Sequence, residues 1–367
     1  MSEKLVTIVV LPLARAHILK MRLEEKGIKC ELEDVHLIEG VTTSTVRVKI
    51  LENDLNEAFK EVDKFLGLKT ETPKKSSKPG QILVPVDFSE VSEKAVMMAF
   101  NIANHLKIQL VIMHSYISPL RFSIPYGDIY PYDTTLLKQT EDAEEEANRQ
   151  FKNFLSPIVH NIGPERWEEV KPEYIVKPGY AEEDILAFAN EHPTRLIIIG
   201  RGGDKSWPGT VGSVTADVMY NATAPVLVIP EEMEPKAVDE FNDVLYATNF
   251  DEKDFTALDK LMNIVKSYDV KVTCAHVGLP DEYGWDIARL EGMKDILNKK
   301  YEKKEFECKL IMGNNVLDTL ESTIERDNVD ILALTTHKRG MISRLFNPSL
   351  ARKMVFHTHI PLLVFHA

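Results

Sequence analysis

The sequence has few cysteines, no excess of positive charge and no long apolar segment, and each absence narrows what the chain can be. The three cysteines are widely spaced, at Cys30, Cys274 and Cys308, and form no C-x-x-C, which argues against a disulfide framework or a zinc site. A formal net charge of -13 disfavours a general nucleic-acid binder, because that function needs a positive field facing the phosphates. No segment approaches the roughly 20 apolar residues that a membrane helix requires. We therefore predict a soluble, cytoplasmic protein with no nucleic-acid or membrane partner.

The sequence also lacks the motifs of several common enzyme classes. It contains no G-x-S-x-G, H-E-x-x-H or G-x4-G-K-[ST], so the usual hydrolase, metalloprotease and P-loop chemistries find no support. His114 and His276 occupy equivalent positions of a repeat, which favours a shared packing or hydrogen-bonding role over catalysis. His357, His359 and His366 have no cysteine or carboxylate ligand beside them. We expect no catalytic residue and no metal site.

The length of 367 residues suits two or three domains. Residues 1–67 follow the order strand, helix, strand, strand, helix, with Gly27 ending the first helix. The expected strands are Leu5–Val10, Ile28–Leu32 and Ser44–Leu51, and the expected helices are Ala14–Lys26 and Leu55–Leu66. This order predicts a small α+β domain of the ferredoxin-like kind and resembles a small bacterial domain assigned to signal transduction. The stretch 68–80 is rich in Pro, Ser and Lys and is typical of a linker.

One segment of the chain occurs twice. Ile82–His114 recurs 162 positions later as Val244–His276 without a gap, and the ends of the two copies match as well. In both copies, near-continuous apolar strands alternate with helical segments, which indicates a parallel sheet covered on both faces. The expected strands are Ile82–Val86, Leu110–His114, Tyr174–Val176, Leu196–Ile199 and Val226–Ile229, then Val244–Ala247, Val272–His276, Phe306–Ile311, Ile331–Leu334 and Leu362–Phe365. We predict two tandem doubly wound α/β domains, at residues 80–231 and 240–367.

A glycine-rich segment links the strand at Leu196–Ile199 to a helix that runs to Asn221. In an open parallel sheet, ligands bind at the carboxyl ends of the strands, where the strand order reverses. Glycines at that place let backbone N–H groups approach an anion, and the start of a helix adds unpaired donors. Ser213 can cap this helix when the site is empty and donate to phosphate when it is filled. The pattern indicates a phosphate cradle, but it also fits a plain turn, and Arg201 and Lys205 can be phosphate contacts or solvated charges.

These segments together resemble the universal stress protein family, whose nucleotide-binding members carry G-x-x-G-x9-G-[ST] at this place. Gly200, Gly203, Gly212 and Ser213 occupy the motif positions, and the segments around Asp87 and His114 resemble the ends of the first two strands of the family. The resemblance covers roughly residues 80–367 and implies an adenine nucleotide, ATP with Mg²⁺, as the ligand. It implies adenosine contacts from Pro85, Val86, Asp87 and Ser115, and phosphate contacts from Gly200, Arg201, Gly203, Gly212, Ser213 and Val214.

The first copy departs from the family pattern in the length of its loop. Eight residues, where the pattern has nine, separate Gly203 from Gly212, and the loop contains the stiff pair Trp207-Pro208. This departure predicts a reshaped cradle.

The second copy departs further. Thr335, Lys338 and Pro348 stand at the three glycine positions, and Asn249 stands at the position of the aspartate. A Cβ atom at the first two positions crowds a phosphate, and proline has no N–H to donate. We therefore expect at most one nucleotide site, in the first repeat.

The sequence and the resemblance favour a non-enzymatic stress-response or signalling protein that binds ATP or a related nucleotide. One alternative is a ligand-free interaction scaffold, in which the N-terminal domain and the aromatic-rich insertion at 117–133 recruit protein partners. A second alternative is a weak ATPase, for which only Asp87 offers a general base. The retained glycines favour the nucleotide, and the shortened loop favours the scaffold. The resemblance implies that such domains pair through their last strands. Pro225–Pro230 and Pro361–His366 are therefore expected to associate within one chain as an internal pseudo-dimer, and a homo-oligomer is also compatible.

Overall fold

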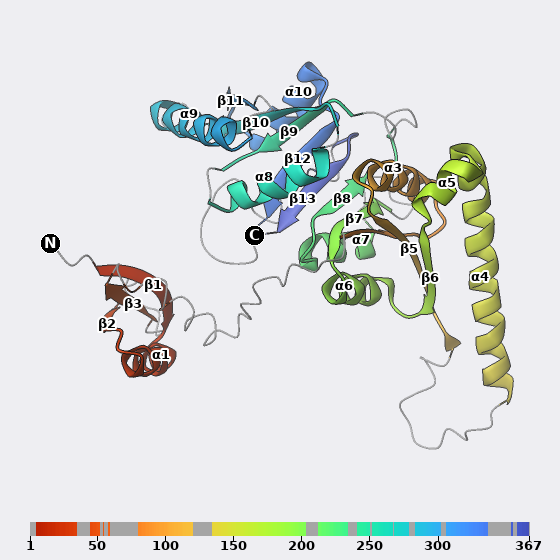
Figure 1. Cartoon of the computed structure of the whole chain (residues 1–367), viewed down its shortest axis with the longest axis horizontal. Helices are drawn as coiled ribbons and strands as arrows, with labels where there is room; N and C mark the ends of the chain where they lie inside the picture. Colours follow the sequence, from red (N-terminus) through yellow and green to blue (C-terminus); the bar gives the residue numbers. More distant parts are fainter. Residues whose placement is uncertain are drawn as a thin grey trace. The chain divides into compact units, whose positions relative to one another are not determined.

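The structure of the protein is a computed structural model. It describes residues 5–34, 45–51, 54, 58, 80–119, 134–202, 212–233, 241–249, 252–266, 268–278, 283–301, 306–336, 354 and 358–366. The chain forms two compact units, Met1–Ser77 and Lys78–Ala367, and the second of them holds both repeats (Figure 1). Among the helices within the described ranges, none has the length and hydropathy to cross a membrane.

The N-terminal unit is a three-stranded antiparallel sheet packed against a helix. Its elements are β1 (Leu5–Pro12), α1 (Leu13–Glu25), β2 (Cys30–Asp34) and β3 (Thr45–Leu51), in the sheet order β1-β3-β2. Ala16, Leu19 and Leu23 recur every three or four residues and so form the buried face of α1. Gly27 has φ +80, a left-handed conformation that glycine adopts freely, and it ends the helix as predicted. The second expected helix, Leu55–Leu66, lies outside the described residues except for Ala58.

The larger unit alternates strands and helices as the sequence predicts. Its strands are β4 (Gln81–Pro85), β5 (Gln109–Tyr116), β6 (Glu173–Pro178), β7 (Thr194–Gly200) and β8 (Val226–Ile229), then β9 (Asp243–Ala247), β10 (Lys271–Gly278), β11 (Phe306–Met312), β12 (Ile331–Thr336) and β13 (Leu362–His366). Its helices are α3 (Glu90–Leu106), α4 (Thr134–Ile162), α5 (Pro164–Val170), α6 (Ala181–Glu191) and α7 (Ser213–Asn221), then α8 (Glu252–Val265), α9 (Tyr283–Lys300) and α10 (Val316–Asp327). Each expected strand overlaps an observed one.

These strands form one ten-stranded sheet in the order β11-β10-β9-β12-β13-β8-β7-β4-β5-β6. Within each repeat, the neighbouring strands are parallel, and the third, second, first, fourth and fifth strands lie side by side in that order. The predicted doubly wound fold is therefore confirmed. Strand order reverses between β4 and β7 in the first repeat, which is where such folds place their ligands.

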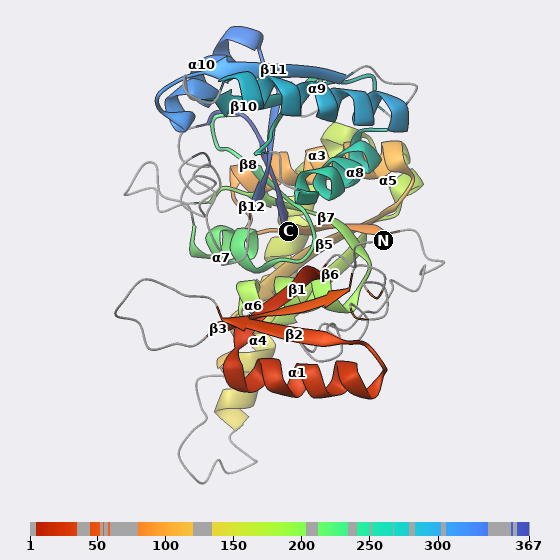
Figure 2. The same ribbon diagram turned by 90° about the vertical axis from the view of Figure 1, so that its left-hand side faces the viewer.

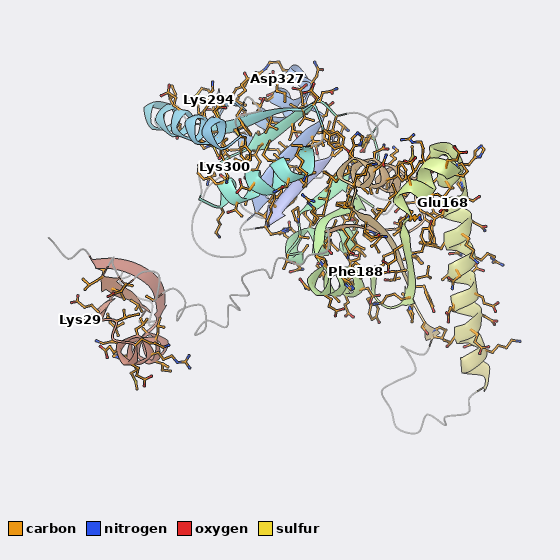
Figure 3. The ribbon with its side chains drawn as sticks, in the orientation of Figure 1. Lys29, Glu168, Phe188, Lys294, Lys300 and Asp327 are labelled. Atoms are coloured by element: carbon orange, nitrogen blue, oxygen red, sulfur yellow. The ribbon has the colours of Figure 1, made fainter. Side chains whose placement is uncertain are left out.

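Helices cover both faces of the sheet (Figure 2). Ile82 and Val84 of β4 pack on one face with α3, α4, α5, α8 and α9, whereas Leu83 packs on the other face with α6, α7 and α10. This alternation follows from the two-residue period of a strand. Figure 3 shows how densely side chains fill the space between the sheet and its helices. Each fully buried aliphatic side chain contributes about 1.5–3 kcal/mol to folding, so this double core is the main source of stability.

The two repeats join through their last strands. β8 and β13 pair antiparallel, with Leu362 opposite Val228 and Val364 opposite Val226. The imidazole Nε2 of His366, at the end of β13, lies 2.6 Å from the carbonyl oxygen of Met219 in α7. The expected association of the last strands within one chain is therefore present.

Candidate functional site

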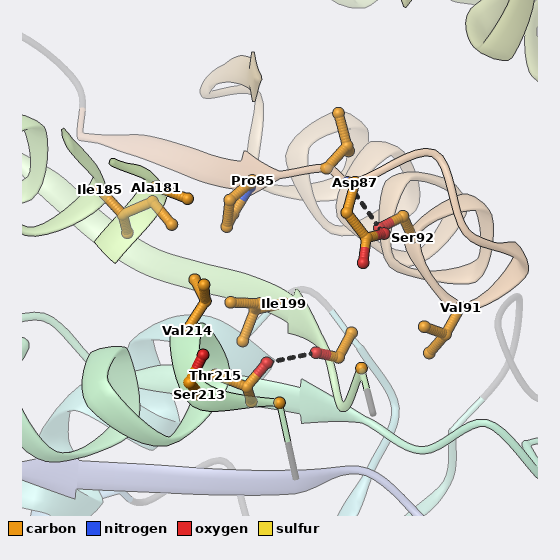
Figure 4. A pocket seen from close by; sticks show the side chains of 14 residues that line it. Pro85, Asp87, Val91, Ser92, Ala181, Ile185, Ile199, Ser213, Val214 and Thr215 are labelled. Atoms are coloured by element: carbon orange, nitrogen blue, oxygen red, sulfur yellow. Dashed lines mark hydrogen bonds between the residues drawn. The ribbon is translucent and has the colours of Figure 1, made fainter. Parts of the chain in front are cut away.

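A cavity of about 270 Å³ lies at the carboxyl ends of β4 and β7, at the point where the strand order reverses (Figure 4). Its volume is close to the lower end of the roughly 300–1,000 Å³ typical of small-molecule sites. Ala181 and Ile185 of α6 form an apolar end, and Asp87 and Ser92 lie together at the other end (Figure 4). The start of α7 forms a third side. The cavity thus joins an apolar surface to a charged one.

Asp87 is held at the cavity by the first turn of α3. Its Oδ1 accepts hydrogen bonds from the backbone N–H of Ser89 (3.1 Å), the hydroxyl of Ser89 (2.5 Å) and the hydroxyl of Ser92 (2.6 Å). Burial opposes ionisation, but these hydrogen bonds outweigh it and hold the pKa of Asp87 below its usual value. Its Oδ2 makes no hydrogen bond within the described part of the chain, and a Cβ added at Gly202 would lie 4.0 Å from it. Asp87 therefore presents one charged oxygen to the cavity.

Two rings fix the turn that carries Asp87. Phe88 has φ +66, a left-handed conformation that costs a non-glycine residue roughly 1–2 kcal/mol. Its ring packs on the imidazole of His114, with 4.1 Å between the ring centroids. The Nδ1 of His114 donates to the carbonyl oxygen of Val86 at 2.8 Å, and burial lowers the pKa of His114, so its ring is neutral at pH 7. This packing offsets the backbone strain and directs Asp87 towards the cavity.

Three glycines line the cavity, and each has a steric reason to be glycine. A Cβ at Gly200 would lie 2.8 Å from Cγ1 of Val91 in α3. Gly202 has φ +45, in the left-handed region that other residues rarely adopt. A Cβ at Gly212 would lie 3.1 Å from the carbonyl oxygen of Gly202, which also accepts the Gly212 N–H at 2.5 Å. The expectation that this glycine donates its N–H to an anion therefore does not fit the observed arrangement.

The helix α7 begins at the cavity with backbone donors that have no partner among the described residues. Ser213 is its first residue, and the cap position belongs to Gly212, so the expectation that Ser213 caps the helix is wrong. The backbone N–H groups of the first three residues of a helix have no partner within it, and the helix dipole adds partial positive charge there. The hydroxyl of Ser213 is exposed and makes no hydrogen bond within the described residues. Thr215 instead ties α7 to β7, since its hydroxyl donates to the carbonyl oxygen of Gly200 at 2.8 Å.

Both repeats match the model of the universal stress protein family, over residues 79–230 and 240–366. The chain belongs to the universal stress protein family. Membership in this family supports a role in the stress response. No curated protein matches the chain.

Several solved structures are similar to this universal stress protein family member. One is a universal stress protein from Archaeoglobus fulgidus DSM 4304, with 16% identity and a TM-score of 0.57, covering 78% of this chain and 98% of that chain. Another is a functionally unknown protein from Pseudomonas aeruginosa PAO1, with 12% identity and a TM-score of 0.48, covering 78% of this chain and 92% of that chain. A third is a universal stress protein in complex with cAMP, with 19% identity and a TM-score of 0.27, covering 42% of this chain and 98% of that chain. The first of these supports the fold alone.

Most of the residues that the family pattern implies as nucleotide contacts line the cavity. They are Pro85, Val86, Asp87, Gly200, Gly212, Ser213 and Val214. Gly203 lies outside the described residues, as do the other residues of 203–211. Ser115 does not line the cavity, and it lies inside β5 rather than past its end. The backbone groups of Ser115 point to the same side of β5 as those of Met113, two residues earlier. The carbonyl oxygen of Met113 accepts the N–H of Val86, the residue just after β4, so the backbone groups of Ser115 point past the end of β4.

Arg201 is placed as a structural link rather than as a lining residue. Its side chain is buried, and its Nη2 lies 2.6 Å from both carboxylate oxygens of Glu232. Burial opposes the ionisation of Glu232, but hydrogen bonds from its own backbone and from Arg201 lower its pKa. The predicted phosphate contact from Arg201 does not fit this arrangement, because the guanidinium is already used.

Several residues that line the cavity were not predicted from the sequence. Gly202 is the most informative of them, because nine residues separate it from Gly212, which is the spacing of the family pattern. Counted from Gly202, the loop is not shortened. Ser92 of α3 and Ala181 and Ile185 of α6 carry no local signal and reach the cavity only through the fold.

The second repeat uses the equivalent positions for internal hydrogen bonds. Asp254 stands at the position of Ser92 and is buried, and Thr335 stands at the position of Gly200. Asp254 accepts from the hydroxyl groups of Tyr246 and Thr248, each at 2.8 Å, and from the backbone N–H of Asn249 at 3.0 Å. The hydroxyl of Tyr246 also lies 2.7 Å from that of Thr335. The carboxylate that faces a cavity in the first repeat is thus replaced by one that faces the core. Lys338 and Pro348 lie outside the described residues.

The remaining candidate residues have structural roles or fall outside the described part. His276 repeats the contact of His114, with its Nδ1 at 2.8 Å from the carbonyl oxygen of Thr248, so the shared hydrogen-bonding role is confirmed. Within the described residues, no group of three or more His, Cys, Asp or Glu side chains could hold a metal ion. Residues 120–133 of the aromatic-rich insertion are not described.

Proposed function

We propose that the chain is a non-enzymatic stress-response or signalling protein of the cytoplasm that binds one adenine nucleotide, ATP with Mg²⁺, in the cavity of the first repeat. The observation that carries this proposal is the Oδ2 of Asp87, which has no partner among the described residues, while three hydrogen bonds to Oδ1 hold the carboxylate at the cavity. A carboxylate oxygen with no partner among the described residues is a strong acceptor for a ligand hydroxyl or amine, because hydrogen bonds to charged groups are stronger than those between neutral groups.

The cavity offers a different surface for each part of a nucleotide. Ala181, Ile185 and Ile199 provide an apolar surface against which a base can pack. The start of α7, with the hydroxyl of Ser213, provides donors and a favourable dipole for phosphate oxygens. Asp87, at the end of the cavity opposite Ala181 and Ile185, would accept hydrogen bonds from the ribose hydroxyls. Mg²⁺ would be held mainly by the phosphates and water, since it usually keeps several waters when it binds with a nucleotide.

The same geometry favours binding over catalysis. A general base works best with a pKa near the working pH, and hydrogen bonds hold the pKa of Asp87 below its usual value. His114 is engaged at Nδ1 and lies against Phe88. The low pKa of Asp87 makes it a weak general base, and His114 is held by Val86 and Phe88, so an ATPase has less support than a binding protein.

A single site per chain is the stoichiometry that the two repeats support. In the second repeat, Asn249 replaces the aspartate, and the side chain of Thr335 occupies the position of Gly200. The nearby carboxylate of Asp254 already accepts three hydrogen bonds and lies in the core.

Calorimetric titration with ATP, with and without Mg²⁺, tests the proposal. We expect one site per chain and no release of phosphate over hours. Gly212→Val should abolish binding, because its side chain would collide with the carbonyl of Gly202 and push this backbone into the cavity. The matched change in the second repeat, Pro348→Val, should leave the affinity unaltered.

Two results would overturn this assignment. Absence of binding at millimolar ATP would favour the ligand-free scaffold, and the search would turn to protein partners. Equal losses from Gly212→Val and Pro348→Val would contradict the one-site model.

A further inference from the structure

A second cavity lies at the opposite end of β7, where the two repeats meet. It has a volume of about 490 Å³ and is lined by the amino-terminal ends of β7 and β8 and by α8 of the second repeat. Thr194 and Arg195 come from β7, and Lys260 and Asn263 come from α8. Because β7 begins here and ends at Gly200, this cavity is separate from the one at Asp87.

Three donors in this cavity have hydrogen-bonding capacity that no described residue uses in full. The hydroxyl oxygen of Thr194 is buried and has no hydrogen-bond partner within the described residues. Lys260 is half-buried and forms no ion pair with any described acid, and burial lowers the pKa of its ammonium group. The guanidinium of Arg195 donates only to the carbonyl oxygen of Asn263, at 3.4 Å, again within the described part. Half-buried charges without a counter-ion are unfavourable, so these groups favour an anion among them.

The charged side chains that line the cavity, within the part of the chain that the structure describes, are all basic. The acid next to Lys260 in sequence, Asp259, is already paired with Lys300 at 2.6 Å and also accepts from the hydroxyl of Tyr301. Among the described residues that line the cavity there is no aspartate or glutamate, whereas His192 adds a third basic side chain. This local positive charge stands out in a chain with a net charge of -13.

We propose that this cavity is a binding site for a small phosphate-bearing anion, held by Thr194 and Arg195 of the first repeat and Lys260 of the second. An arginine fork, a lysine point charge and a hydroxyl together suit the several oxygens of a tetrahedral phosphate. The bound anion would contact both repeats and so link them at a place other than the β8–β13 pairing. The site does not depend on the proposed nucleotide site, because the two share no residue.

Titration of the full chain with inorganic phosphate at constant ionic strength tests this site, with calorimetry as the readout. We expect one phosphate site, and at least a tenfold loss of affinity in Lys260→Gln and in Arg195→Gln. Lys266→Gln removes the same charge from an exposed position just after α8 and should bind phosphate as the unaltered chain does. A parallel titration with glycerol phosphate shows whether the site prefers a free phosphate or a phosphate monoester.

Three outcomes would overturn the proposal. The unaltered chain could fail to bind either phosphate at tens of millimolar, or Lys260→Gln and Arg195→Gln could bind like it. Phosphate binding could also vanish in Gly212→Val, which would place the phosphate in the cavity at Asp87. Thermal unfolding without phosphate checks that each variant is folded. If Lys260→Gln does not fold, the phosphate affinity of Arg195→Gln alone tests the proposal.

Discussion

Replacing Asp87 by asparagine tests the proposed nucleotide site at the atom on which it depends. The three donors on Oδ1, from Ser89 and Ser92, require an acceptor, so the amide oxygen of the new side chain must take that place. The amide NH2 then occupies the position of Oδ2 and presents a donor without charge to the cavity. A hydrogen bond between a ligand hydroxyl and a carboxylate contributes about 1.5–3 kcal/mol, so ATP should bind roughly 10- to 150-fold more weakly.

Calorimetry with ATP and Mg²⁺ measures this loss, with Asp217→Asn as the matched control. Asp217 lies on the exposed side of α7 and does not line the cavity, so its removal changes the net charge by the same amount without touching the site. The control should bind ATP normally. Unchanged affinity in Asp87→Asn would refute the assigned contact. Equal losses of affinity in both variants would show that ATP binding depends on the total charge of the protein and not on a contact with Asp87.

Two further predictions concern stability. Asp254→Ala removes the carboxylate that accepts hydrogen bonds from the buried hydroxyl groups of Tyr246 and Thr248, so urea denaturation should show a loss of about 3 kcal/mol in unfolding free energy. A loss of less than about 1 kcal/mol would show that these hydrogen bonds do not stabilise the fold. Burial holds the pKa of His114 below its usual value of about 6.5, so the unfolded chain takes up a proton at a higher pH than the folded chain does. The unfolding free energy should therefore fall as the pH drops below about 6.5, and this fall should be smaller in His114→Gln. An equal fall in the unaltered chain and in His114→Gln would show that His114 is not responsible.

The fold was predictable because its signals are local and repeated. Apolar runs such as Leu196–Ile199 are buried on both faces of a parallel sheet, and that burial imposes a composition that the sequence displays directly. The gapless recurrence of Ile82–His114 then required two copies of one fold. Expected and observed strand ends differ by at most two residues, because backbone pairing can continue past the last apolar side chain, as it does at Ser115.

The candidate site was predictable only in part, because contacts across the chain decide it. Glycine spacing locates the loop, but only the left-handed φ of Gly202 and its closeness to Asp87 identify it as a lining residue. The pairing of Arg201 with Glu232 joins residues 31 positions apart, and no sequence pattern announces it. Likewise, the apolar end of the cavity depends on how α6 packs against the sheet.

The two repeats carry their carboxylates at different positions. This difference predicts what happens when the aspartate of the first repeat is introduced at the equivalent position of the second. The first repeat has Asp87 at the strand end and Ser92 on the helix, whereas the second has Asn249 at the strand end and Asp254 on the helix. Asn249→Asp would restore the acid of the first repeat, but its own backbone N–H already donates to Asp254 at 3.0 Å. Two carboxylates so close repel each other, and one of them is buried, so the change should lower the thermal midpoint and create no second ATP site. A second site by calorimetry, or an unchanged midpoint, would show that the exchange of positions does not account for the loss of the site.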